Sequence, residues 1–160
     1  MKKPSLKKPK KIIVAISGGF DPIHIGHIRL INEARVLGDE LVVIMNNDHW
    51  LRAKKGYIFM PQKERKELLM ALSAVDKVIY TSHTKTTNYK DPIGRSVVNE
   101  LKKLKPDIFA NGGDRFLDDI PENKLCPKLG IKMIFNVGKG GKIQSSSDLV
   151  HKATKKKLKK

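Results

Sequence analysis

Two histidines three residues apart in a glycine-rich segment are the residues of this chain best suited to chemistry. His24 and His27 enclose Gly26 and follow Gly18-Gly19. Imidazole N–H groups donate hydrogen bonds to phosphate, and two such donors can stabilise the charge that builds up when the phosphorus is attacked. One such donor is typically worth about 2.7–4 kcal/mol. The pair therefore indicates electrostatic catalysis at a phosphate, with no covalent nucleophile.

The residues on either side predict a strand, a turn and a helix. Residues 12–16 form an unbroken apolar run rich in β-branched side chains, typical of a buried parallel strand. Apolar residues then recur at helical spacing over 28–38. We expect His27 in the first helical turn and His24 just before it, where unpaired backbone N–H groups and the helix dipole favour an anion. This geometry predicts a phosphate site, and the alternative is that His24 and His27 are satisfied loop and helix-cap histidines.

Strand-type and helix-type segments alternate from residue 12 to residue 151. The pattern predicts an α/β fold, with a Rossmann-like, doubly wound parallel five-stranded sheet and helices on both faces. The expected strand order is 3-2-1-4-5, which brings the ends of the first and fourth strands together at the ligand crevice. Strands are expected at 12–16, 40–45, 76–80, 106–110 and 131–137, and helices at 28–38, 62–72, 93–104 and from 145.

The histidine segment, which reads Gly-Gly-Phe-Asp-Pro-Ile-His-Ile-Gly-His, resembles the signature of the HxGH nucleotidyltransferases. This superfamily includes cytidylyltransferases, nicotinate mononucleotide and pantetheine-phosphate adenylyltransferases, and the adenylyltransferase domain of ADP-heptose synthases. The resemblance implies transfer of a nucleoside monophosphate from NTP to a small phosphomonoester, with release of pyrophosphate. It implies that His24 and His27 stabilise the transition state, and that Gly18, Gly19, Phe20, Asp21 and Gly26 contact the nucleotide.

A second cluster, Lys54-Lys55-Gly56, follows the second predicted strand in a segment expected to be a mobile loop. A lysine-bearing loop at this place in the family implies that Lys54 or Lys55 holds the triphosphate, although an ordinary solvated loop is an alternative. Arg65 matches an arginine of several subfamilies, which implies contact with the acceptor or a phosphate. Its alternative is a solvent-facing position on a basic helix.

The fourth predicted strand leads into Asn111-Gly112-Gly113-Asp114-Arg115, which resembles the Gly-Gly-Asp turn of ADP-heptose synthases. The resemblance implies that Gly113 and Asp114 contact the nucleotide, and we place Arg115 with the residues that bind acceptor or phosphate. A carboxylate such as Asp114 can accept hydrogen bonds from ribose or acceptor hydroxyls. The same composition is also common in plain turns.

Three serines, Ser145, Ser146 and Ser147, stand at the start of the last predicted helix. The family carries a Ser/Thr-rich motif here that holds the β- and γ-phosphates, which implies the same for these hydroxyls. Helix capping is the plainer reading, but it needs one serine. Several subfamilies place an arginine beside the motif, where this chain has Lys139 and Lys142. We place Lys142 with the residues that bind acceptor or phosphate.

Mg²⁺ is the expected cofactor, held mainly by the phosphates because the chain shows no dedicated carboxylate cage. Asp21 either contacts the metal or accepts N–H bonds within its own turn. ATP is the favoured nucleotide and CTP the next, because residues 51–55 and 63–66 also resemble glycerol-3-phosphate cytidylyltransferases. An acceptor of the nicotinamide mononucleotide type stays open, since the segment 20–24 is shared with pyridine-nucleotide adenylyltransferases.

Two other classes of protein fit parts of the sequence. His-Ile-Gly-His also occurs in class I aminoacyl-tRNA synthetases, but 160 residues leave no room for a tRNA-reading body and no Lys-Met-Ser-Lys-Ser loop is present. A non-catalytic nucleotide- or RNA-binding domain is the remaining alternative. Residues 58–60, Ile-Phe-Met, form an apolar patch that a homodimer partner is expected to cover.

The net charge of +17 belongs mostly to the two ends of the chain. With the six lysines of 1–11 and the six of 152–160 set aside, residues 12–151 carry +5. These ends are expected to be disordered basic tails that contact nucleic acid or anionic surfaces weakly at most, because they contain no aromatic residue for base stacking. Residues 12–151 are expected to form one nucleotidyltransferase domain.

The cysteine count and the hydropathy of the chain indicate its cellular compartment. Cys126 is the only cysteine, so no internal disulfide forms and a reducing compartment is expected. No apolar stretch approaches the ~18 residues of a membrane span, and the basic start lacks the apolar region of a secretory signal. We expect a cytoplasmic protein, with a nuclear address left open by the lysine-rich ends.

Overall fold

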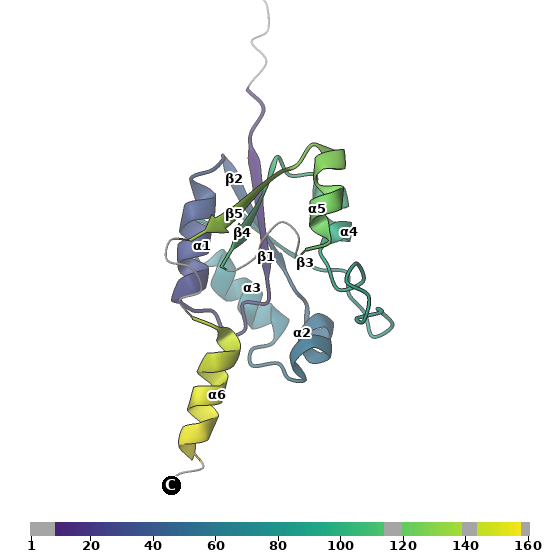
Figure 1. Ribbon diagram of the computed structural model, residues 1–160. Coiled ribbons are helices and arrows are strands. Elements are labelled where there is room, and N and C mark those ends of the chain that lie inside the picture. The colour runs from purple at the N-terminus through teal and green to yellow at the C-terminus, as the bar shows by residue number, and fades with distance from the viewer. Residues whose placement is uncertain (1–8, 114–119, 139–143, 158–160) are drawn as a thin grey trace, which may run out of the picture.

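Five parallel strands form one sheet in the computed structural model, which describes residues 9–113, 120–138 and 144–157 (Figure 1). The order is β3-β2-β1-β4-β5, so the predicted order is confirmed. β1 pairs with β2 on one side, in a register that sets Ile13 opposite Glu40, and with β4 on the other. The strands are β1 Ile13–Gly18, β2 Glu40–Met45, β3 Lys77–Tyr80, β4 Ile108–Gly112 and β5 Lys132–Val137.

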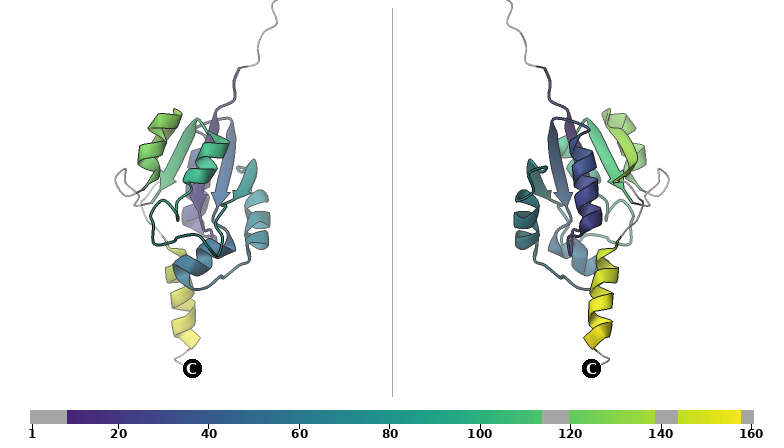
Figure 2. Two further views of the ribbon diagram at one scale, coloured as in Figure 1. Left: turned by 90° about the vertical axis from the view of Figure 1, so that its right-hand side faces the viewer. Right: turned by 90° about the vertical axis from the view of Figure 1, so that its left-hand side faces the viewer.

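Helices cover both faces of the sheet, as the doubly wound pattern predicts (Figure 2). α1 Ile25–Arg35 and α3 Gln62–Met70 pack on one face, while α4 Val98–Leu104 and α5 Glu122–Leu125 pack on the other. A short 3₁₀ turn, Pro127–Leu129, follows α5. The sheet is therefore the middle layer of three.

The alternation of side chains along β1 divides the core into two parts. Val14 and Ile16 are fully buried against the α1 and α3 side, and Ala15 is fully buried against the α4 and α5 side. Successive strand residues point to opposite faces, so an unbroken apolar run is needed wherever both faces are covered. This is why the run at 12–16 reads as a buried strand.

Two helices lie at the carboxyl ends of the strands, α2 Asp48–Lys55 and α6 Ser146–Lys157 (Figure 1). The expectation of a loop at the lysine cluster is therefore wrong. The side chain of Asn47 accepts a hydrogen bond from the Trp50 N–H at 3.1 Å, and Gly56 ends the helix at φ 79°. Both are residues that cap helices well.

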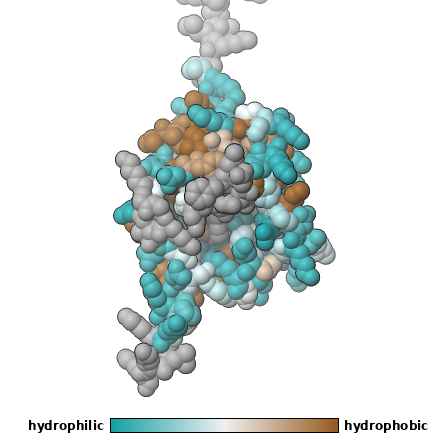
Figure 3. All heavy atoms as spheres, in the orientation of Figure 1, coloured by the Kyte–Doolittle hydropathy of each residue, from teal (hydrophilic) through white to brown (hydrophobic). Residues whose placement is uncertain are grey.

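The final helix also departs from the expected organisation. α6 continues through Lys152 to Lys157, so the chain is helical beyond residue 151, where a disordered tail was expected. The expected tail of 1–11 has only residues 9–11 among those the structure describes, and their side chains are exposed. On the face shown in Figure 3 the surface of α6 is largely hydrophilic. Among the described residues, no helix is both long and apolar enough to cross a bilayer.

Candidate active site

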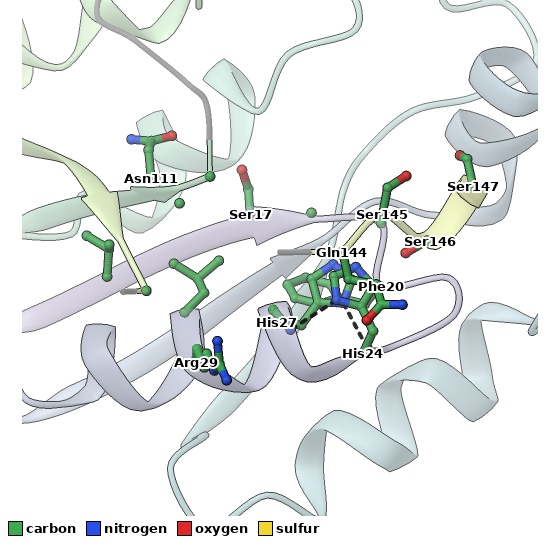
Figure 4. Close-up of a pocket in the computed structure, with 18 of the residues that line it drawn as sticks. Ser17, Phe20, His24, His27, Arg29, Asn111, Gln144, Ser145, Ser146 and Ser147 are labelled. Carbon is green, nitrogen blue, oxygen red and sulfur yellow. Dashed lines mark hydrogen bonds between the residues drawn. The ribbon is translucent and has the colours of Figure 1, made fainter. Parts of the chain in front are cut away.

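A cavity of about 310 Å³ opens at the carboxyl ends of β1, β4 and β5, which is where a doubly wound sheet binds its ligand (Figure 4). It brings together segments that are more than a hundred residues apart in the sequence. Its lining includes Gly18, Gly19, Phe20, His24, Gly26, His27, Lys55, Gly113, Ser145, Ser146 and Ser147, all expected from the sequence, and also Ser17, Arg29, Leu30, Trp50, Asn111 and Gln144.

The two histidines form a stacked pair at the start of α1. His24 is the N-cap residue and His27 the third helical residue, as the sequence predicts. Nδ1 of His24 accepts the Gly26 N–H at 3.1 Å, and Nδ1 of His27 accepts the His24 N–H at 3.2 Å (Figure 4). The ring centroids are 3.8 Å apart. Because each Nδ1 accepts, each Nε2 of the neutral rings carries the proton, and both rings are left as N–H donors.

Both rings are neutral at physiological pH. Burial, the neighbouring His24 and the charge of Lys55 lower the pKa of His27 to about 3. Burial and Lys55 also lower the pKa of His24. The pair therefore offers hydrogen-bond donors without fixed positive charge, and the cationic part of the site comes from other residues.

Gly26 and Phe20 are the close neighbours of the histidine pair. A Cβ on Gly26 would stand 3.0 Å from Cε1 of His24, so a side chain there would displace the capping ring. Phe20 is buried with φ 51°, a left-handed conformation that non-glycine residues rarely adopt, and its ring centroid is 4.8 Å from that of His27. The turn thus places an aromatic ring against the second histidine.

The two lysines of α2 point to different places. Lys55 lines the histidine cavity, where its Nζ donates to the backbone carbonyl of Asp21 at 3.1 Å. Burial lowers the pKa of Lys55. Lys54 is exposed and lies outside this cavity, with its Nζ 6.0 Å from the Trp50 ring centroid. Lys55 is thus the lysine beside the histidines.

Asp21 is a structural anchor in this fold. Its side chain is fully buried, and its two oxygens accept the N–H groups of Phe59 at 2.8 Å and Met60 at 2.6 Å. It is not among the residues that line the cavity. The partners belong to the segment before α3, where hydrogen bonds within its own turn were expected. Both oxygens are occupied, so the geometry favours the structural alternative over a metal contact.

Arg65 departs from both of its expected positions. It is 1% exposed, which excludes the solvent-facing alternative, and it does not line the cavity. Its guanidinium donates to the backbone carbonyls of Gly19, Asn46 and Met60 at 2.7–2.9 Å and pairs with Asp48 at 2.6 Å. Arg65 therefore ties the glycine turn to β2, α2 and the segment before α3, and no surface of it is open to a substrate phosphate.

The serines meet the histidine segment across the mouth of the cavity. Ser146 Oγ donates to the Pro22 carbonyl at 2.8 Å, and Ser145 Oγ accepts the Asp148 N–H at 3.4 Å, as a capping serine does. The N-terminus of α6 thus faces the pair. Asp114, Arg115, Lys139 and Lys142 lie outside the described residues.

Some cavity residues were missed from the sequence. Arg29 stands on α1 two residues after His27, Asn111 ends β4 and is 3% exposed, and Trp50 reaches the cavity from α2. The signal for Asn111 was its place in the Gly-Gly-Asp turn, whereas Trp50 required the helix that the sequence did not predict. No group of three or more His, Cys, Asp or Glu side chains in the described part of the chain could hold a metal ion.

Comparison with known proteins places the chain in a family. The cytidylyltransferase-like family matches residues 15–139. The FAD synthase of Thermococcus kodakarensis is 37% identical over 113 residues, which is 70% of this chain and 69% of that protein. The bifunctional protein HldE of Desulfatibacillum aliphaticivorans is 33% identical over 132 residues, which is 81% of this chain and 25% of that protein.

A solved structure shows the same architecture. The lipopolysaccharide core biosynthesis protein of Thermoplasma volcanium superposes with a TM-score of 0.61 at 28% identity, over 82% of this chain and the whole of that one. The family match takes in the glycine turn, both histidines and Lys55. On this evidence the protein belongs to the cytidylyltransferase-like family and is a nucleotidyltransferase.

Proposed function

We propose that this nucleotidyltransferase transfers AMP from ATP to a small phosphomonoester and releases pyrophosphate. The observation that carries the proposal is the stacked His24–His27 pair, two neutral N–H donors at a helix N-terminus that faces a second one across the cavity. Such donors stabilise negative charge that develops at a phosphorus during attack. Relatives named FAD synthase support the choice of adenylate.

The reaction would be an in-line displacement. An oxygen of the acceptor phosphate attacks the α-phosphorus of ATP, a new P–O–P bond forms, and the bond to the β-phosphate oxygen breaks so that pyrophosphate leaves. Nε2–H of His24 and His27 would donate to the α-phosphate oxygens. Lys55, with Ser146 and Ser147, would hold the β- and γ-phosphates across the cavity mouth.

Mg²⁺ would screen the charge of the triphosphate in this proposal. The described residues fit a metal that rests mainly on phosphate oxygens, because they contain no carboxylate cluster and both oxygens of Asp21 are occupied by backbone N–H groups. Mg²⁺ keeps several water ligands and is commonly bound through substrate phosphates. The protein's own contribution is then to position the triphosphate.

The relatives indicate which acceptor phosphates to test first. FAD consists of AMP joined through a pyrophosphate to FMN, so FMN is the first acceptor to test. A heptose phosphate is the second, because the chain also matches HldE and its Gly-Gly-Asp turn resembles ADP-heptose synthases. Glycerol-3-phosphate with CTP and nicotinamide mononucleotide with ATP complete the set of candidate pairs.

The test is pyrophosphate release with Mg²⁺, with each of ATP, CTP, GTP and UTP against FMN, heptose-1-phosphate, glycerol-3-phosphate, phosphocholine and nicotinamide mononucleotide. We expect release with ATP and one acceptor, and loss of that release in His27→Ala. A matched control is His49→Ala, since His49 is exposed on α2 and lines none of the cavities described for this chain. Release with CTP alone would overturn the choice of base, and failure to bind any nucleotide would overturn the proposal.

A further inference from the structure

A second hollow of about 210 Å³ adjoins the histidine cavity on the other side of Trp50. The two share Ser17 and Trp50, so a ligand can extend from one into the other. The lining of the second hollow consists of Ser17, Asn46, Trp50, Lys54, Pro92, Arg95, Ser96, Val97, Ile120, Pro121 and Glu122.

The indole of Trp50 is held in place between these two spaces. Its Nε1–H donates to the backbone carbonyl of Arg95 at 2.8 Å, a contact between residues 45 positions apart. A smaller hollow on the same side is lined by Trp50, Lys54, Tyr89 and Arg95 as well. A fixed indole beside open space offers a flat face for stacking a conjugated ring.

Two cations, Lys54 and Arg95, line the hollow together with one carboxylate, Glu122. Neither the Lys54 ammonium nor the Arg95 guanidinium has an ion-pair partner among the described residues, where the pairs are Lys10–Asp107, Arg35–Asp76 and Arg65–Asp48. Glu122, the buried carboxylate of the hollow, accepts the N–H of Val97 at 3.0 Å. The two cations therefore remain available to an anionic group of a ligand.

The buried side-chain amide of Asn46 lines the hollow. Asn46 is 4% exposed, and its Oδ1 has no hydrogen-bond partner in the described part of the chain. Its backbone is already engaged, because the N–H donates to Gly18 and the carbonyl accepts from Arg65. Buried acceptors are almost always paired in native structures, by protein groups or by ordered water, so one left open beside a hollow can take a donor from a ligand.

We propose that this hollow is the acceptor subsite, and that it takes a phosphomonoester whose organic part carries a planar conjugated ring with an N–H donor. The inference rests on the proposed function and deepens it. The ring would stack on Trp50, its N–H would reach Asn46, and its phosphate would lie between Arg95, Lys54 and the histidines.

FMN, which has both the ring and an imide N–H, is the probe, and ribitol 5-phosphate is its ringless counterpart. Binding is measured by calorimetry without ATP in wild type, Trp50→Leu, Asn46→Leu and Arg95→Gln. Arg52→Gln is the control, because Arg52 is exposed on the same helix and lines none of the hollows. We expect FMN to bind at least tenfold more tightly than ribitol 5-phosphate in wild type.

The variants separate the contacts. Trp50→Leu and Asn46→Leu should weaken FMN binding about tenfold and leave ribitol 5-phosphate unchanged, whereas Arg95→Gln should weaken both. ATP affinity in Asn46→Leu and Arg95→Gln should stay within twofold of wild type, since neither residue lines the histidine cavity. Far-UV circular dichroism and unfolding curves establish that each variant is folded.

Equal binding of the two probes, FMN affinities like that of Arg52→Gln in all three variants, or no binding of either probe would each overturn the inference. Failure of the proposed function gives a different result. If FMN binds in a Trp50-dependent manner but no acceptor of the panel supports pyrophosphate release, the subsite stands and the reaction falls. If release occurs and the KM for the acceptor is unchanged in all three variants, the reaction stands and the subsite falls.

Discussion

In the proposed mechanism, His24 and His27 use one ring nitrogen to bind the backbone and the other to bind the substrate. Each Nδ1 accepts a hydrogen bond from a main-chain N–H at the start of α1, which fixes the ring and leaves Nε2 as the donor of a ring that lines the cavity. A donor that is already fixed costs no reorganisation when charge develops at the phosphorus. The same bonds that begin the helix would therefore also hold the two proposed catalytic rings in position.

Replacing His27 should lower the chemical rate more than substrate affinity. In His27→Asn we expect kcat to fall by about 10²–10³, the usual effect of removing one donor to a developing oxyanion. ATP affinity should change little, because the neutral ring adds no charge to the ground state. Steady-state and single-turnover kinetics measure the two effects separately. His49→Asn should behave as wild type, and an equal loss in both variants would contradict the assignment.

Acid should destabilise the fold through His27. Its folded-state pKa of about 3 lies below the ordinary value of 6.5, so the unfolded chain binds the proton more readily between these values. The contribution of this group is complete above pH 6.5 and is lost as the pH falls toward 3, by up to about 1.4 kcal/mol per pH unit. Urea unfolding at pH 7 and pH 5 should show a smaller loss for His27→Asn than for wild type. The same loss in both would rule this out.

The site residues that could be predicted are those whose role depends on near neighbours in the sequence. The histidine spacing, Gly26 and the serines specify local geometry, and the structure places them as expected. Arg65 could not be predicted, because its burial depends on acceptors from three separate segments, at Gly19, Asn46 and Met60. The sequence shows that Arg65 is positively charged, but it does not show which carbonyl groups accept its hydrogen bonds.

At the scale of elements, α2 determines which lysine meets the histidines. A helix advances 100° per residue, so the adjacent Lys54 and Lys55 leave it in different directions, one beside each hollow. The cap residues Asn47 and Gly56 were visible in the sequence and would have predicted this helix. α4 likewise begins at Val98, five residues later than expected, because turns occupy the segment with Pro92 and Gly94.

The segment before α3 should depend on Asp21 for its attachment. Asp21→Asn replaces one acceptor oxygen with an NH₂ group that opposes a backbone donor, and we expect a loss of about 1–3 kcal/mol in the free energy of unfolding. The Mg²⁺ concentration that half-saturates pyrophosphate release should be unchanged. Glu64→Gln on the exposed side of α3 serves as the control. A several-fold shift in Mg²⁺ requirement without loss of stability would assign Asp21 to the metal instead.

On the scale of the whole molecule, the sheet order brings the distant site segments together. β1 lies between β2 and β4. The turn at Gly19, helix α2 and Gly113 after β4 therefore lie together at the carboxyl edge of the sheet. This arrangement was predictable, because alternating elements with buried parallel strands leave few topologies. α5, Glu122–Leu125, was not predictable, because four residues carry too little periodic pattern.

The apolar patch at residues 58–60 predicts that the protein forms a homodimer. Phe59 is 56% exposed, while Ile58 and Met60 are partly buried. We expect a homodimer in which a partner covers Phe59, because a large exposed aromatic side chain is costly to leave in water. Light scattering at micromolar protein should give twice the chain mass of 18.0 kDa, and Phe59→Ser should return it to the monomer. A monomeric wild type would contradict this.

The hydrogen bonds of the histidine pair also affect which ions can bind to the two rings. Two histidines one helical turn apart are a common chelating arrangement for zinc or nickel, which need a ring nitrogen with a free lone pair. Here both Nδ1 lone pairs are directed at main-chain N–H groups, and both Nε2 atoms hold protons. A transition metal would have to break two backbone contacts or displace two protons before it could bind. The two rings are thus suited to donate to an oxyanion and poorly suited to bind a transition metal, so trace zinc should not compete with the substrate for them.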